Sequence, residues 1–173
     1  TIVRALGETD GDVLVFLPGT PEIRRVQALL ESARLPVAIK VFALFGDLAA
    51  SEQDAALAPS PRGTRKIVLA TNIAETSLTI EGVRIVVDSG QERRSRFDPV
   101  TGMSRLELGS ISRASADQRR GRAGRIQAGV CHRLWSEVEH SALPAQTAPE
   151  IVGADLAPLA LELANWGIAD PGA

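Results

Sequence analysis

The sequence contains few of the residues on which several classes of protein depend. A single cysteine, Cys131, excludes an internal disulfide and a cysteine-based metal cluster. Aromatic residues make up 3% of the chain and tyrosine is absent, so extended base stacking on aromatic side chains is not expected. No apolar run approaches the roughly 18 residues of a membrane span, and the first residues lack the basic-then-apolar pattern of a signal peptide. The prediction is a protein of the reducing cytoplasm with no membrane partner.

Sequence motifs that mark a complete active site are missing as well. No G-x-x-x-x-G-K-[ST] sequence occurs, so the chain has no P-loop to hold phosphates. No G-x-G-x-x-G follows a predicted strand, which argues against a dinucleotide-dependent oxidoreductase. Neither histidine, His132 nor His140, belongs to a metal-ligand pattern, so no metal site is predicted. The chain is expected to lack a self-contained active site.

The overall composition is that of an ordinary globular domain, but its basic residues are unevenly placed. The chain has 173 residues, of which 45% are apolar and 23% are charged, and its net charge is -2. Only Lys40 and Lys66 are lysines among its 19 basic residues, so the other 17 are arginines. Five of these arginines fall within one short segment, at positions 113, 119, 120, 122 and 125. This local cluster, and not the net charge, is the feature that indicates a functional site.

Short apolar runs alternate with amphipathic or polar segments along the chain. The runs predict strands over residues 13–17, 37–44, 66–70, 83–87 and 130–135, and the segments between them predict helices over 21–35, 51–57 and 115–125. Alternation of this kind predicts an α/β fold with a mainly parallel sheet and helices on both faces. Ligands of such sheets bind outside the carboxyl ends of the strands.

Two further segments complete the predicted organisation. Residues 96–107 read as a β-hairpin, with Asp98-Pro99 and Thr101-Gly102 in its turn. A leucine-rich, helical tail follows Pro149. The predicted division is a domain over residues 1–145 and a helical extension over 146–173.

The arginine-rich segment carries the strongest chemical signal. In a continuous helix, Gln118, Arg122 and Arg125 would be spaced i, i+4 and i+7 and would share one face. Fixed guanidinium groups bind phosphate through charge-assisted hydrogen bonds. Gly121 and Gly124 each cost a helix about 1 kcal/mol, which suits a helix that another surface approaches closely. The alternative is a solvated charged face on which Gln118 and Ser115 form a capping box.

A polar loop after the third predicted strand is the second signal. Residues 70–80 read ATNIAETSLTI and follow a buried strand at once. Hydroxyl and amide side chains at this place can donate to phosphate oxygens or ribose, which gives affinity without base specificity. Ordinary helix capping by Thr71, Asn72 or Ser77 is the alternative.

Together these segments resemble the second RecA-like domain of superfamily 2 helicases, within the DEAH-box/RNA helicase A group. VLVFLPGTPEI resembles helicase motif IV, ATNIAETSLTI motif V and QRRGRAGR motif VI. The run from DSG to GVCHRLWSE is most similar to the bacterial HrpB branch of this group. The resemblance covers nearly the whole chain. It implies an ATP-dependent RNA helicase whose P-loop and DEAH box lie on a first RecA-like domain, so the isolated chain is expected to be inactive.

The resemblance also implies residues for the nucleotide. Arg122 and Arg125 match arginine fingers that reach the γ-phosphate of ATP, and Gln118 matches a glutamine at the γ-phosphate or the attacking water. Glu81 stands where the family often has an aspartate near the ribose. Leu57 replaces a phenylalanine that stacks on adenine in many relatives, so weak base discrimination is expected. ATP and its Mg²⁺ would be held mainly by the first domain.

A second set of residues matches positions that contact nucleic acid. Thr71, Asn72 and Gly46 match contacts to the RNA backbone, and Arg93 stands where a lysine often contacts RNA. Ser77 matches a serine that couples the nucleotide state to these contacts. Residues 96–107 match a hairpin associated with strand separation.

The expected partners are single-stranded RNA, or DNA, bound without sequence preference, together with the first RecA-like domain and a winged-helix domain of the same chain. The alternative function is a non-catalytic RNA- or protein-binding scaffold that uses the same fold. An upstream P-loop and DEAH box would favour the helicase over the scaffold.

Overall fold

The computed structural model describes all residues except 34, 37, 77, 125–126, 169 and 171–173. Two predicted site residues, Ser77 and Arg125, therefore lie outside the described residues.

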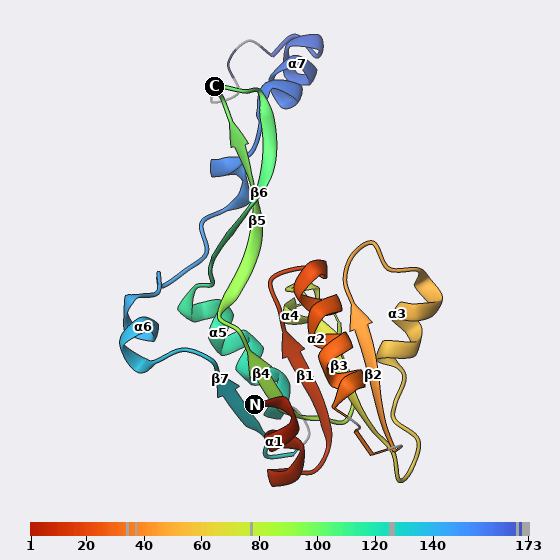
Figure 1. The fold of residues 1–173 in the computed structure, drawn as a ribbon. Helices are drawn as coiled ribbons and strands as arrows, with labels where there is room; N and C mark the ends of the chain where they lie inside the picture. The colour runs from red at the N-terminus through yellow and green to blue at the C-terminus, as the bar shows by residue number, and fades with distance from the viewer. Residues whose placement is uncertain (34, 37, 77, 125–126, 169, 171–173) are drawn as a thin grey trace. The chain divides into compact units, whose positions relative to one another are not determined.

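A five-stranded parallel sheet forms the centre of the fold, in the order β2-β3-β1-β4-β7 (Figure 1). Its strands are β1 (Asp12–Phe16), β2 (Ile39–Leu44), β3 (Arg65–Ala70), β4 (Val83–Asp88) and β7 (Val130–Arg133). The register pairs the last residues of neighbouring strands: Ala70 lies opposite both Leu44 and Phe16, and Phe16 lies opposite Asp88. The carboxyl ends of β2, β3, β1 and β4 therefore meet at one edge of the sheet. β1 and β3 are buried on both faces, which explains their continuous apolar sequences.

Helices cover both faces of the sheet. The first face packs against α1 (Ile2–Glu8) and α2 (Thr20–Ser32), in a core that includes Ala5, Ile23 and Leu30. The second face packs against α3 (Ala50–Leu57), α4 (Ile73–Thr76) and the 3₁₀ turn η1 (Gly121–Gly124), in a core that includes Ala56, Ala74 and Ala123. The predicted α/β architecture is confirmed.

The predicted helices and strands are found with ends shifted by a few residues, and two helices were not predicted. α1 is short and buries one residue, Ala5, so it leaves little periodicity to read. α6 (Glu137–Ala142) buries none of its residues. Its signal is a capping box in which Ser136 accepts from the Glu139 backbone and the Glu139 side chain accepts from the Ser136 backbone.

The prediction of one continuous helix over residues 115–125 is wrong in a way that matters for the site. The α-helix α5 runs from Arg113 to Arg120, and the chain then tightens into η1. Glycine stabilises an α-helix poorly, so the turn changes at Gly121. Gln118 is exposed whereas Arg122 is buried, so the two side chains do not share the predicted face. The predicted alternative cap is also corrected, because Ser112 accepts the hydrogen bond from the backbone of Ser115 at 3.1 Å.

The chain divides into two compact units. The first contains Thr1–Glu92 and Leu108–Thr147, and the second contains Arg93–Glu107 and Ala148–Ala173. Strands β5 (Gln91–Asp98) and β6 (Met103–Ser110) pair with one another where the hairpin was predicted. The second unit also holds the 3₁₀ turn η2 (Glu150–Gly153) and the helix α7 (Ala157–Asn165). The division at residue 145 stays a prediction. Across the described residues, no helix has the length and apolar character needed to cross a membrane.

Candidate functional site

Three predicted RNA-contacting residues lie at the edge where the strands end. Gly46 follows β2, and Thr71 and Asn72 follow β3 directly. The Thr71 backbone N–H donates to the Leu44 carbonyl at 3.2 Å, which ties the loop after β3 to the end of β2. The structure therefore places these residues on neighbouring loops at the carboxyl edge, where parallel sheets bind ligands.

A polar cavity of about 310 Å³ opens beside Asn72. α4 contributes Glu75 and Thr76 to its wall, and α5 contributes Ser115 and Gln118. Gln118 is exposed, so its amide can donate and accept at the cavity. The predicted water- or phosphate-contacting glutamine thus lies beside a predicted RNA-contacting residue.

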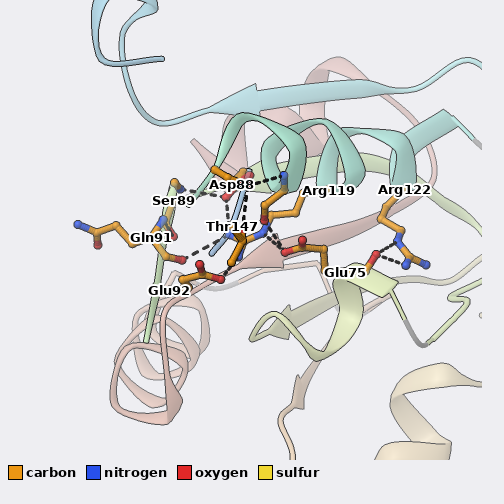
Figure 2. Close-up of polar contacts among 11 residues, drawn as sticks. Glu75, Asp88, Ser89, Gln91, Glu92, Arg119, Arg122 and Thr147 are labelled. Carbon is orange, nitrogen blue, oxygen red and sulfur yellow. Dashed lines mark hydrogen bonds and ion pairs between the residues drawn. The ribbon is translucent and has the colours of Figure 1, made fainter. Parts of the chain in front are cut away.

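The most buried basic group of the site is Arg119 (Figure 2), whose side chain is 1% exposed. Its guanidinium forms ion pairs with Glu75 at 2.9 Å, Asp88 at 3.1 Å and Glu92 at 3.6 Å. It also lies 4.9 Å from the centre of the Phe16 ring. Arg119 thereby joins α5 to α4, to the end of β4 and to the start of β5.

Asp88 faces Arg119 from the end of β4 and is fully buried. Burial raises the pKa of its carboxyl above the usual value of 3.8, and the Arg119 guanidinium and the Gly90 backbone N–H act in the opposite direction. One oxygen accepts from Gly90 at 2.9 Å, while the other, Oδ2, has no hydrogen-bond partner among the described residues. Asp88 is therefore held through one oxygen by the Gly90 main chain and the Arg119 guanidinium.

Arg122 is also buried, but its described hydrogen bonds run to main-chain carbonyls. Its Nε donates to the Glu75 carbonyl at 2.9 Å, its Nη1 donates to the Leu78 carbonyl at 2.6 Å, and its Nη2 also donates to the Glu75 carbonyl. The side chain is 7% exposed. These bonds fix the guanidinium on the loop that follows β3 (Figure 2).

The other two predicted nucleotide-contacting residues lie at the opposite edge of the sheet. Leu57 ends α3, and the Lys66 ammonium at the start of β3 donates to the carbonyls on either side of it, those of Ala56 at 2.8 Å and Ala58 at 2.7 Å. Burial lowers the pKa of Lys66, and nearby Asp12 and Glu81 act to raise it. Glu81 precedes β4, and with Asp12 it lines a second cavity of about 560 Å³.

The segment between β3 and β4 therefore carries residues of the candidate site at both edges of the sheet. It begins with Thr71 and Asn72 at the carboxyl edge, carries the carbonyls that hold Arg122, and ends with Glu81 at the amino edge. Arg93 belongs to the second unit. Nowhere in the part of the chain that the structure describes do three or more His, Cys, Asp or Glu side chains cluster as a metal site.

Sequence reasoning did not identify Arg119 or Glu75 as parts of the site. Of the four clustered arginines that the structure describes, Arg119 and Arg122 are buried, while the side chain of Arg120, beside Arg119, is 62% exposed. Glu75 is the only carboxylate between Thr71 and Ile80, and that isolation in a polar loop is the one available signal.

Comparison with known proteins identifies the family. The description "Helicase conserved C-terminal domain" matches residues 1–127. The chain belongs to this helicase family. It is 49% identical over 166 residues to the ATP-dependent RNA helicase HrpB of Escherichia coli, covering 96% of this chain and 20% of that protein. It is also 44% identical over 165 residues to the probable ATP-dependent RNA helicase DHX34 of Mus musculus, covering 95% of this chain and 14% of that protein.

Solved structures agree with this assignment. Two crystal structures of HrpB from E. coli, one titled a DExH-box NTPase and the other a DEAH/RHA helicase, match at TM-scores of 0.90 and 0.92 with 47% sequence identity. They cover 99% and 98% of this chain, which spans 21% and 22% of theirs. The predicted RecA-like fold and the resemblance to the DEAH-box/RNA helicase A group are confirmed. The chain spans about a fifth of the HrpB length.

Proposed function

We propose that this helicase domain is the second RecA-like half of an ATP-dependent RNA helicase and supplies Arg122 to ATP bound on the first half. The buried, oriented guanidinium of Arg122 is the observation that carries this proposal. Arg125 and Gln118 are proposed to act at the same phosphate, and ATP with its Mg²⁺ is placed mainly on the first RecA-like domain. The two relatives above are named ATP-dependent RNA helicases, which supports the proposal.

ATP hydrolysis depends on charge stabilisation and positioning of the reactants more than on covalent catalysis by the protein. Transfer of the γ-phosphoryl group to water develops charge on oxygen atoms, and one arginine finger contributes about 10³ to 10⁵ in rate. A guanidinium already fixed by carbonyls loses little conformational entropy when it meets a phosphate. Because the arginine and the nucleotide would lie on different domains, hydrolysis requires the two domains to close.

The residues proposed to contact nucleic acid and those proposed to contact the ribose and base lie at different edges of the sheet, which supports the proposal of a helicase motor. Gly46, Thr71 and Asn72 lie at the carboxyl edge, while Glu81 and Leu57 lie at the amino edge of the same sheet. The first set is proposed to hold the nucleic-acid backbone and the second to face the ribose and base. Arg93 is proposed as a further backbone contact and Ser77 as the coupling residue. Backbone contacts give binding that is independent of sequence and sensitive to salt.

The test is ATP turnover of the full-length protein carrying Arg122→Ala. We expect kcat at saturating RNA to fall by about 10³-fold or more, because the transition state loses its compensating charge. RNA affinity, measured by fluorescence anisotropy, should change little.

The proposed location of the protein is the cytoplasm.

The matched control is Arg120→Ala, which removes an arginine two positions away whose side chain is 62% exposed. Its kcat should stay within about threefold of the unmodified enzyme. Near-normal turnover by Arg122→Ala would refute the arginine-finger assignment. RNA binding without any ATP turnover in the unmodified full-length protein would favour a non-catalytic scaffold.

A further inference from the structure

Glu75, in the segment after β3, contacts the arginine-rich segment at more than one point. Its side-chain oxygen Oε2 accepts from the Ser115 hydroxyl at 2.7 Å and from Arg119 Nε at 2.9 Å. Its main-chain carbonyl accepts from Arg122. One residue therefore contacts both α5, through its carboxylate, and η1, through its carbonyl (Figure 2).

The position of Arg122 depends on where α4 lies. Its described hydrogen bonds run to the carbonyl of Glu75, within this helix, and to the carbonyl of Leu78, two residues beyond the last helical residue, Thr76. α4 has four residues, too few to be stable without tertiary contacts. Those contacts include the buried Ala74 and the Glu75 carboxylate, which is the described side-chain link from α4 to α5.

We infer that Glu75 is a positioning residue for Arg122. Its carboxylate fixes α4 on α5, and this contact places the two carbonyls that orient the Arg122 guanidinium. The inference rests on the proposed function, in which Arg122 acts on the γ-phosphate. It assigns Glu75 no contact with ATP or RNA.

Loss of the carboxylate should affect the chemical step and not substrate binding. In the full-length protein we expect Glu75→Ala to lower kcat about 10- to 100-fold, because a shift of about 1 Å in a catalytic group costs up to about 100-fold. KM for ATP should change by less than about threefold. Glu75→Gln keeps an oxygen that can accept from Ser115 and Arg119, so it should restore most of kcat.

The decisive comparison is a double-mutant cycle measured at saturating RNA. If Glu75 acts through Arg122, then Glu75→Ala should lower kcat by less than about threefold in an Arg122→Ala background. An equal loss in both backgrounds, or an unchanged kcat in Glu75→Ala, would overturn the inference while leaving the Arg122 assignment intact. Wild-type kcat in Arg122→Ala alone would instead refute the proposed function.

The matched control is Asp117→Ala on the same helix. Asp117 pairs with Arg133 on β7 at 2.9 Å, so the substitution removes a carboxylate–arginine contact of α5 that does not involve α4. We expect kcat to stay within about threefold of the unmodified enzyme. A loss of kcat equal to that of Glu75→Ala would show that any weakened α5 contact suffices, and would overturn the positioning role.

Discussion

Among the five clustered arginines, neighbours in the sequence have opposite environments. Arg119 is 1% exposed and bonded to carboxylates on three elements, while the Arg120 side chain is 62% exposed and pairs with Asp117 on its own helix at 3.6 Å. A buried charge is tolerated when partners replace its hydration, and a solvated ion pair adds little. The two arginines should therefore differ sharply in their contribution to stability.

We predict that Arg119→Met lowers the free energy of unfolding of the chain by about 3–5 kcal/mol, because the buried carboxylates of Asp88 and Glu92 lose their cation. Urea unfolding followed by circular dichroism measures this difference. Arg120→Met, the matched control, should change the free energy by less than about 0.5 kcal/mol. Equal effects of the two substitutions would show that the buried network contributes nothing particular to stability.

The sequence alone does not show which of the clustered arginines are buried. Five arginines in 13 positions mark a functional segment, but their identity alone does not tell which ones turn inward. That choice is made by Glu75, Asp88 and Glu92, which reach Arg119 from elements distant in the sequence. A partner 44 residues away leaves no local pattern to read.

At the scale of elements, the change from α5 to η1 decides where the arginines lie. Gly121 and Gly124 have negative φ and no atom within 4 Å of an added Cβ. Gly129, before β7, is different: an added Cβ would lie 1.8 Å from the Ala123 carbonyl oxygen. Among the described residues, a side-chain Cβ would therefore meet no atom at the first two glycines, whereas the third glycine is required by close packing.

We predict that Gly121→Ala leaves the chain as stable as before or stabilises it by up to about 1 kcal/mol, because alanine restricts the unfolded chain. Gly129→Ala should destabilise it by about 1–3 kcal/mol through overpacking. Thermal unfolding of both variants compares them directly. Destabilisation by Gly121→Ala of the size seen for Gly129→Ala would mean that the turn tolerates no side chain.

The strands could be predicted well and the arginine-rich segment only in part. Buried strands such as β1 and β3 appear as continuous apolar runs because both of their faces are covered. The segment over residues 115–125 was expected to be one α-helix because its spacing fits one. Two glycines and the carbonyls that hold Arg122 favour a tighter turn instead.

At the scale of the whole molecule, the chain spans 20% of HrpB and 14% of the DHX34 relative. Its motifs could be assigned from the sequence because segments that resemble helicase motifs IV, V and VI occur in the correct order. The sequence alone does not predict that the proposed contacts are distributed over two edges of one sheet. That distribution depends on the direction of the loop between β3 and β4.

We predict that the isolated chain releases no phosphate from ATP above background, with or without RNA, because its sequence lacks a P-loop. A malachite-green assay on the purified chain measures this, with the full-length protein as the active control. Turnover that stays with the isolated chain and is lost in its Arg122→Ala variant would refute a site shared between two domains.

The central claim is that Arg122 acts on a nucleotide held by another domain, and single-turnover cleavage of ATP by the full-length protein tests it most directly. With enzyme in excess over labelled ATP and RNA saturating, Arg122→Ala should bind ATP with nearly unchanged affinity and cleave it about 10³-fold more slowly. Cleavage at the unmodified rate, or a loss fully explained by weaker ATP binding, would contradict the account.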